Sequence, residues 1–402
     1  MLPMQGNSTG PLTGVRIIDL TTVVMGPYAA QILADLGADV IRVEAPGGDF
    51  MRDFDPKKSP KMGAFSMNVN RNKRSMVLDL KTVSGLAAML DLVATADVFL
   101  SNLRPVALDK LGLADEALRQ RRPDLIYCSA TGFGSNGPYA QKAAYDDVIQ
   151  AASGFASMFD WTGPAPAYAP TIVADKVTSL HIVYAILAAL YRKAISGQGD
   201  FIEVPMAESM AAFNLIEHLS GHTFDPPHGE FSYLRLRTEH RRPRRSADGW
   251  VCILPYSDRN WKDFFCLAGR PELADDPRFA TINDRIVNVD ALYGLLDEAV
   301  ATRTTAEWME LCDEHSIPAV PVVELEHIEH DPHFAAVGLL EPRVHPTEGP
   351  YRTIRTPIMF SSGSPGLRHH APNLGQHTAE ILAELGYDEQ AIETVMAENP
   401  HA

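Results

Sequence analysis

The chain of 402 residues has few cysteines, namely Cys128, Cys252, Cys266 and Cys312. They form no C-x-x-C pair and do not stand among histidines at the spacing of zinc ligands. Isolated cysteines of this kind are typical of buried apolar positions in a reducing compartment. We therefore expect a cytoplasmic protein that has neither a disulfide framework nor a bound metal.

Positive charge and long apolar runs are also scarce. The chain has 35 Lys and Arg against 51 Asp and Glu, for a net charge of −16, which argues against nucleic acid as a partner. The longest apolar stretch, residues 179–191, contains Ser179 and His181 and is too short and polar to predict a membrane span. The opening MLPMQGNSTGPLTG has no basic region followed by an apolar one, so we expect no signal peptide.

Three common motifs are missing from the positions where they would carry chemistry. The turn after the first predicted strand reads TTVVMGP rather than G-x-G-x-x-G, the chain has no G-x-x-x-x-G-K-[ST], and no G-x-S-x-G follows a predicted strand. These absences argue against a nicotinamide dehydrogenase, a P-loop ATPase and an ordinary α/β-hydrolase.

The first half of the chain instead alternates short apolar segments with helix-like ones. This alternation predicts an α/β fold with a mainly parallel sheet covered by helices on both faces. Ligands of such sheets bind beyond the carboxyl ends of the strands. The expected strands are 15–20, 40–44, 75–80, 97–100 and 125–132. Composition shifts then predict a large domain over 1–224, a smaller α/β domain over 225–325, and a return to the large domain over 326–402.

Two basic segments stand out in this acidic chain. NRNKRS (70–75) places Arg71, Lys73 and Arg74 before a predicted strand, and YLRLRTEHRRPRR (233–245) holds six arginines. The first is either a solvated charged loop or a phosphate site. The second is either a surface or subunit contact or a source of guanidinium groups for carboxylate or phosphate.

Two acidic helix starts are candidates for chemistry. Asp175 opens a long apolar helix predicted over 174–195, and Tyr145 and Asp146 precede another helix. The spacing alone favours a role as helix cap or dipole partner for each acidic residue. His181, inside the apolar helix, is interpreted as a core histidine.

Several segments together, in order along nearly the whole chain, resemble the class III CoA-transferase family, which also contains the α-methylacyl-CoA racemases. The matching text includes PLTGVRIIDLT, GPYAAQILADLGADVIRVEAPGGD, NRNKRSMVLDLK, ADVFLSNLRPVALDKLGL, SATGFGSNGPYA, YDDVIQAASG, GQGDFIEVPMAE and PNLGQHTAEILAELGY. The resemblance implies a Rossmann-like large domain, a small domain, and an interlocked, ring-like homodimer. It implies transfer of CoA from an acyl-CoA to a carboxylic acid, with CoA as substrate and no tightly bound cofactor.

The resemblance also implies roles for individual residues. Asp175 matches the family's catalytic aspartate, which forms aspartyl anhydride and aspartyl-CoA thioester intermediates. Val24 and Met25 line the acyl site, and Tyr145 lies beside the substrate carboxylate. Contacts to CoA fall on Leu78, Lys81, Asn102, Leu103, Arg104 and Lys110.

Departures from the family pattern bear on the substrate. Formyl-CoA transferase-like members have Gln where this chain has Val24, and a glycine-rich lid where it has GHTFDPPHGEF, which argues against oxalate and formate. Racemases have a His at the position of Tyr145, so a racemase is the second hypothesis. A non-catalytic acyl-CoA-binding protein is the third. A dicarboxylic substrate held by Arg235, Arg237 or Arg241 is a further hypothesis.

Overall fold

The computed structural model describes residues 10–361 and 366–399, so part of the N-terminal segment discussed above lies outside the described residues. The described chain forms two compact units. The first contains residues up to Ala152, Pro170–Met210 and the chain from Pro332 on, and the second contains Ser153–Ala169 and Ala211–Asp331. The second unit thus includes all of the predicted 225–325, and it extends to Ala211 and Asp331 and adds the segment Ser153–Ala169.

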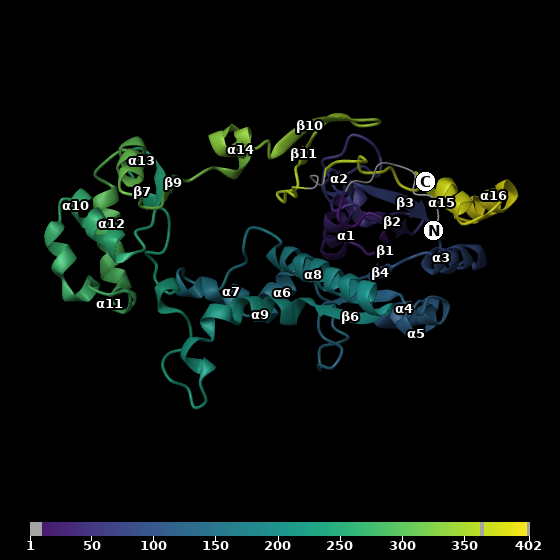
Figure 1. The fold of residues 1–402 in the computed structure, drawn as a ribbon, viewed down its shortest axis with the longest axis horizontal. Coiled ribbons are helices and arrows are strands. Elements are labelled where there is room, and N and C mark those ends of the chain that lie inside the picture. Colours follow the sequence, from purple (N-terminus) through teal and green to yellow (C-terminus); the bar gives the residue numbers. More distant parts are fainter. Residues whose placement is uncertain (1–9, 362–365, 400–402) are drawn as a thin grey trace. The chain divides into compact units, whose positions relative to one another are not determined.

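The first unit is built on a parallel sheet of six strands in the order β3-β2-β1-β4-β5-β6 (Figure 1). The strands are β1 (Arg16–Leu20), β2 (Asp39–Glu44), β3 (Lys73–Val77), β4 (Val98–Ser101), β5 (Ile126–Thr131) and β6 (Asp200–Pro205). All five neighbouring pairs are parallel. The predicted α/β class and parallel sheet are therefore confirmed.

Helices and one hairpin complete this unit. The helices are α1 (Met25–Asp35), α2 (Ala64–Asn70), α3 (Val83–Ala94), α4 (Pro105–Leu111), α5 (Asp115–Arg121), α6 (Asp146–Ala152), α8 (Val173–Ser196), α14 (Pro332–Ala336), α15 (Thr378–Glu384) and α16 (Glu389–Glu398). The hairpin pairs β10 (Leu340–His345) with β11 (Gly349–Ile354) in antiparallel register.

The two faces of the sheet differ in chemistry because side chains alternate along a strand. Ile18, Ile41 and Met76 point to one face and form an apolar core with residues of α3, α5, α15 and α16. Asp19, Arg42 and Ser75, their neighbours in sequence, point to the other face and are buried there. A strand that reads as uniformly buried therefore carries charge on one side.

Helix α8 packs in the first unit against α1, α6, β5 and β6. By length and apolar composition alone it could cross a membrane, but a core helix meets the same criterion. It ends at Gly197, whose left-handed backbone is the usual helix terminator.

The second unit has its own core. A three-stranded sheet has the order β7-β8-β9, with both pairs antiparallel. Trp308, Phe264 and Leu296 lie at the centre of its apolar cluster. The elements are α7 (Phe155–Met158), α9 (Met206–His218, which starts in the first unit), β7 (Arg244–Arg245), β8 (Trp250–Ile253), α10 (Asp258–Leu267), α11 (Ile282–Val287), α12 (Val289–Val300), α13 (Thr305–Glu314) and β9 (Ala319–Pro321).

Candidate active site

The strand order places a topological switch point between β1 and β4. From β1 the chain proceeds outward to β2 and β3, then returns to the other side of β1 as β4. The turns that leave β1 and β4 therefore diverge at their carboxyl ends, where open α/β sheets bind ligands. The two turns are joined directly, because the Asn102 amide accepts from Thr22 N–H and donates to Thr22 C=O, both at 2.8 Å.

The turn after β1 carries the predicted acyl-site residues into the start of α1. Val24 and Met25 are buried at the entrance of the helix. The first N–H groups of a helix have no partner within it, so they are free to bind an acceptor. The backbone N–H of Met25 donates to the carboxylate of Asp175. The structure thus brings Met25 and Asp175 together.

Asp175 lies in the first turn of α8 and is 9% exposed. The Ser179 hydroxyl, one turn later, donates to Met25 C=O at 2.7 Å and so joins α8 to the start of α1. Asp175 is therefore held from both helices, although its own side chain does not cap α8.

A second carboxylate lies against Asp175. Asp146, at the start of α6, is buried and accepts the backbone N–H of Asp175 at 3.0 Å. Its other oxygen accepts from the Gln150 amide at 2.5 Å. The sequence favoured a plain helix-start role for Asp146, whereas the structure makes it the neighbour of the candidate nucleophile.

Burial and the charge of Asp146 raise the pKa of Asp175 to about 7, and the hydrogen bond from Met25 N–H opposes this rise. Strongly perturbed carboxylates cluster at functional sites, since structural ones are usually neutralised by cations. Lys176, the next residue, directs its ammonium to the Thr171 hydroxyl instead. The charged form of the Asp175 carboxylate is therefore less stable in this site than it would be in water.

The other predicted contacts lie in the same sheet or on its exposed rim. Leu78 is buried directly after β3, while Lys81, Arg104 and Lys110 are exposed, and Leu103 belongs to the rim of the apolar core. Because β3 and β4 are parallel, the turns that follow them lie at the same edge of the sheet. Tyr145 is 63% exposed beside Asp146. The structural bond between Asn102 and Thr22 was not predicted.

The basic segment 70–75 does not form the phosphate site considered from the sequence. Arg71 pairs with Asp35 at 2.6 Å, and Lys73 with Asp19 at 2.9 Å. Arg74 pairs with Asp39 at 2.8 Å and also reaches Glu380 and Glu384. The charges of these three residues are neutralised by carboxylates of the same unit. They are neither a solvated loop nor available to a ligand.

Much of the arginine-rich run is likewise occupied within the second unit. Arg235 donates to the Tyr293 hydroxyl at 2.9 Å, and Arg237 lies over the Trp161 ring. Arg244 is buried and pairs with Asp297 at 2.7 Å. Arg241 remains exposed.

His181, interpreted from the sequence as a core histidine, is half-buried, and its ring is bonded within its own helix. Its Nδ1 lies 2.9 Å from Val177 C=O, and its ring packs on Tyr184. Within residues 10–361 and 366–399, the one group with metal-ligand geometry is Glu324, Glu326 and His327, all exposed. It lies in the second unit.

A buried carboxylate at the start of a helix, beside a parallel-sheet switch point, is the candidate nucleophile of this α/β fold. The chain matches the model of CoA-transferase family III over residues 12–378 and belongs to that family. It is 35% identical to the succinate–glutarate CoA-transferase of Agrobacterium fabrum, over 94% of this chain and 96% of that one.

It is 32% identical to the human succinyl-CoA:glutarate CoA-transferase, over 96% of this chain and 89% of that protein. A crystal structure of the D175A mutant of Rv3272 from Mycobacterium tuberculosis is similar with a TM-score of 0.81. The two share 32% identity over 94% of this chain and all of that one. The predicted family and enzyme class are confirmed: the protein is a family III CoA-transferase.

Proposed function

We propose that this enzyme moves CoA between carboxylic acids through covalent intermediates on Asp175. The observation that carries the proposal is the Asp175 carboxylate, nearly buried, beside a second carboxylate and in contact with the helix N–H of Met25. A carboxylate is a weak nucleophile in water, but removal from water and close placement of a bound thioester offset this weakness.

The reaction balances without any net proton transfer. An oxygen of Asp175 attacks the thioester carbonyl of the donor, the C–S bond breaks, and CoA leaves as thiolate from a mixed anhydride. The thiolate then attacks the aspartyl carbonyl and the donor acid leaves as carboxylate. The acceptor carboxylate attacks the aspartyl-CoA thioester, and the released thiolate attacks the acceptor's acyl carbonyl. Transfer to the acceptor regenerates the Asp175 carboxylate.

The surroundings of Asp175 suit these steps. Acylation converts a charged side chain into a neutral one. This removes the desolvation cost of the buried charge and its repulsion from Asp146. When CoA thiolate attacks the aspartyl carbonyl, negative charge develops on the Asp175 oxygen. The Met25 N–H is placed to stabilise that charge, as an oxyanion-hole donor does.

We propose that CoA binds at the carboxyl edge of the sheet, over Leu78, Asn102 and Leu103. Lys81, Arg104 and Lys110 are exposed there and would meet the phosphates. Tyr145 would lie beside the substrate carboxylate. A dicarboxylic acid is the proposed substrate class, since two relatives are named for succinate or succinyl-CoA and glutarate.

The interlocked homodimer also stays a proposal. In support, α8 presents a row of exposed apolar side chains at helical spacing, namely Leu180, Tyr184, Tyr191 and Ile195. Sedimentation at micromolar concentration should give twice the chain mass, and a monomer would contradict the proposal. The cytoplasmic location remains a prediction.

The function is tested by mass spectrometry of CoA esters. The enzyme would be mixed in D2O with succinyl-CoA or a branched acyl-CoA and a panel of free acids. We expect a new CoA ester that requires both partners and disappears in Asp175→Ala, while that variant still binds CoA. Deuterium at the α-carbon without a new ester would instead support the racemase.

A further inference from the structure

The turn that carries Met25 has an unfavourable backbone conformation. Val23 has φ of 68°, in the left-handed region. A β-branched residue rarely adopts this region, and doing so costs about 1–3 kcal/mol. Such a conformation persists only where the surrounding structure fixes it. Val23 lies two residues before the N–H that contacts Asp175, so the groups that hold Val23 also position that N–H.

Side chains from three places in the sheet hold this turn by its backbone. Thr21 N–H donates to Asp19 at 3.2 Å, and Thr22 N–H donates to Asn102 at 2.8 Å. Val23 N–H donates to Asp49 Oδ2 at 2.9 Å. The last bond is made at the strained residue itself, by a side chain that follows β2.

Asp49 is itself fixed in place. Its Oδ2 also accepts from Arg42 Nη2 at 2.7 Å, and its Oδ1 accepts from Met51 N–H at 3.0 Å. Its own N–H donates to Glu44 at 3.1 Å. Asp49 is buried, so these bonds act in a medium of low dielectric, where they hold geometry firmly.

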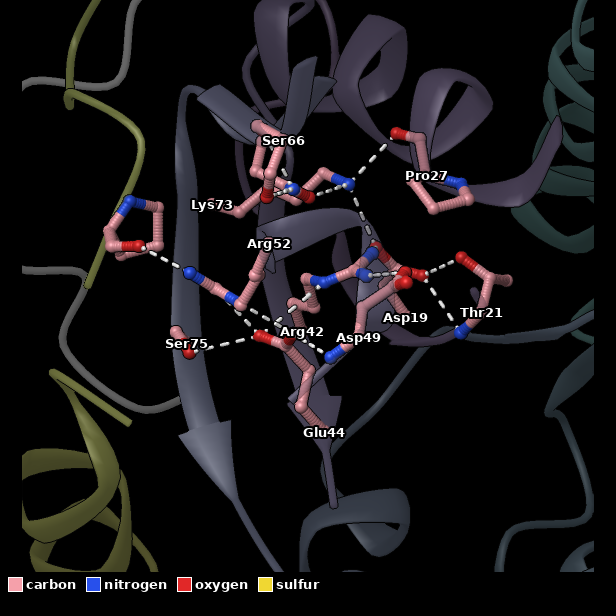
Figure 2. Close-up of polar contacts among 12 residues, drawn as sticks. Asp19, Thr21, Pro27, Arg42, Glu44, Asp49, Arg52, Ser66, Lys73 and Ser75 are labelled. Carbon is pink, nitrogen blue, oxygen red and sulfur yellow. Dashed lines mark hydrogen bonds and ion pairs between the residues drawn. The ribbon is translucent and has the colours of Figure 1, made fainter. Parts of the chain in front are cut away.

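Figure 2 shows that Arg42 and Asp49 belong to a larger buried network of charges. Arg42 also lies 3.5 Å from both Asp19 and Glu44. Lys73 reaches Asp19 at 2.9 Å and the carbonyl of Pro27, in the first turn of α1, at 2.8 Å. The network therefore binds the backbone on both sides of Met25, at the N–H of Val23 before it and at the carbonyl of Pro27 after it.

We propose that Asp49 is a positioning residue for acyl transfer, holding Val23 in its left-handed turn so that Met25 N–H meets the Asp175 oxygen. This inference rests on the proposed function, because it assumes that Asp175 is the acylated group. Asp49 touches no reacting atom. Its effect on rate is expected because displacement of a catalytic group by about 1 Å can cost about 100-fold.

The test compares two buried aspartates, Asp49 in the segment after β2 and Asp35 at the end of α1. In Asp49→Asn the charge that pairs with Arg42 is lost and the bond to Val23 weakens. Asp35→Asn is the matched control, because Asp35 is equally buried, pairs with Arg71 at 2.6 Å, and lies at the far end of α1. Both variants lose a buried ion pair, but only the first acts on the turn.

We expect Asp49→Asn to lower kcat by about 10-fold to 100-fold. KM for acyl-CoA should stay within about 3-fold, since uniform binding is untouched. The acid limb of kcat/KM should move to higher pH, because the Met25 N–H bond is what lowers the pKa of Asp175. The groups facing Asp175 are Asp146 of α6 and Met25 N–H of α1, and neither is altered chemically. Asp35→Asn should keep both kcat and the acid limb.

A double variant, Val23→Gly with Asp49→Asn, separates positioning from general damage. Glycine adopts the left-handed region without strain, so the double variant should recover kcat by about 5-fold or more over Asp49→Asn. It also serves if the single variant does not fold. A folded Asp49→Asn with unchanged kcat and acid limb overturns the inference, as does a double variant no better than the single one.

These failures are distinguishable from failure of the proposed function. If Asp175→Asn retains transferase activity, the covalent mechanism is wrong whatever Asp49 does. If Asp175→Asn is inactive and Asp49→Asn behaves as wild type, only the positioning role is wrong.

Discussion

Two carboxylates in contact decide the chemistry at the scale of single residues. Asp146 accepts the backbone N–H of Asp175, and its charge adds to burial in raising the pKa of Asp175 to about 7. No described cation neutralises the pair, in contrast to Asp19, whose buried carboxylate meets Lys73 and Arg42. The charged form of Asp175 therefore stays destabilised, which favours its reaction as a nucleophile.

Asp146→Asn removes that charge while leaving an oxygen to accept the Asp175 N–H. The acid limb of kcat/KM, which reports deprotonation of free Asp175, should move to lower pH than in wild type. Asp147→Asn, which changes an exposed neighbour on the same helix, is the control and should leave the limb unmoved. An unmoved limb in Asp146→Asn would show that the two carboxylates are not coupled.

Asp175→Asn should make the fold more stable at alkaline pH. A carboxyl group whose pKa is raised by folding binds its proton more tightly in the folded chain, so wild-type stability falls as pH rises from about 4 to about 7. The neutral amide avoids this loss. We expect a gain in unfolding free energy on the order of 2–4 kcal/mol at pH 8, vanishing near pH 4. Denaturant titrations at both pH values measure it, and a loss of stability at pH 8 would contradict the account.

At the scale of elements, the joint between β1 and α1 is packed too tightly for change. A Cβ atom at Gly26 would lie 2.3 Å from Thr21 Cβ, in a side chain that is already bound to Asp19. The glycine next to Met25 thus lets the helix begin close to the end of the strand.

Gly26→Ala should therefore shift the start of α1. We expect kcat to fall by about 10-fold or more, and the unfolding free energy to fall by about 1–3 kcal/mol. Gly294→Ala in α12 is the matched control, because a Cβ there meets nothing within 4 Å. It should preserve activity and leave stability equal or higher. Full activity in Gly26→Ala would refute the role given to this joint.

Much of the sheet could be predicted from the sequence, because short apolar strands and intervening helices repeat with clear punctuation. The buried charges could not be placed in the same way. Arg42 and Glu44 stand within an apolar strand, which signals burial with partners, but the partner Asp49 is fixed only by tertiary structure. Likewise, Asp146 reads as a helix start until α6 and α8 are seen together. The segment 70–75 was misjudged because its cations pair with residues distant in sequence.

At the scale of the whole molecule, an acidic enzyme must bind an anionic substrate through local cations. The net charge is −16, and Lys81, Arg104 and Lys110 are exposed after β3 and around α4. Attraction to the CoA phosphates should then be short in range and sensitive to salt.

Lys81→Gln should raise KM for acyl-CoA by about 3-fold to 10-fold with little change in kcat, because it removes binding that ground and transition states share. The effect should shrink as ionic strength rises. Lys262→Gln, an exposed change in the second unit, is the control. Equal KM values for the two variants at low salt would place the CoA phosphates elsewhere.

The most direct measurement is peptide mass spectrometry of enzyme incubated with succinyl-CoA in the absence of an acceptor acid and quenched with acid. The account predicts a CoA thioester on the peptide containing Asp175, converted to a hydroxamate by hydroxylamine and lost on addition of the acceptor. Transfer of CoA with no adduct at any time, or with an adduct on another residue, would contradict it.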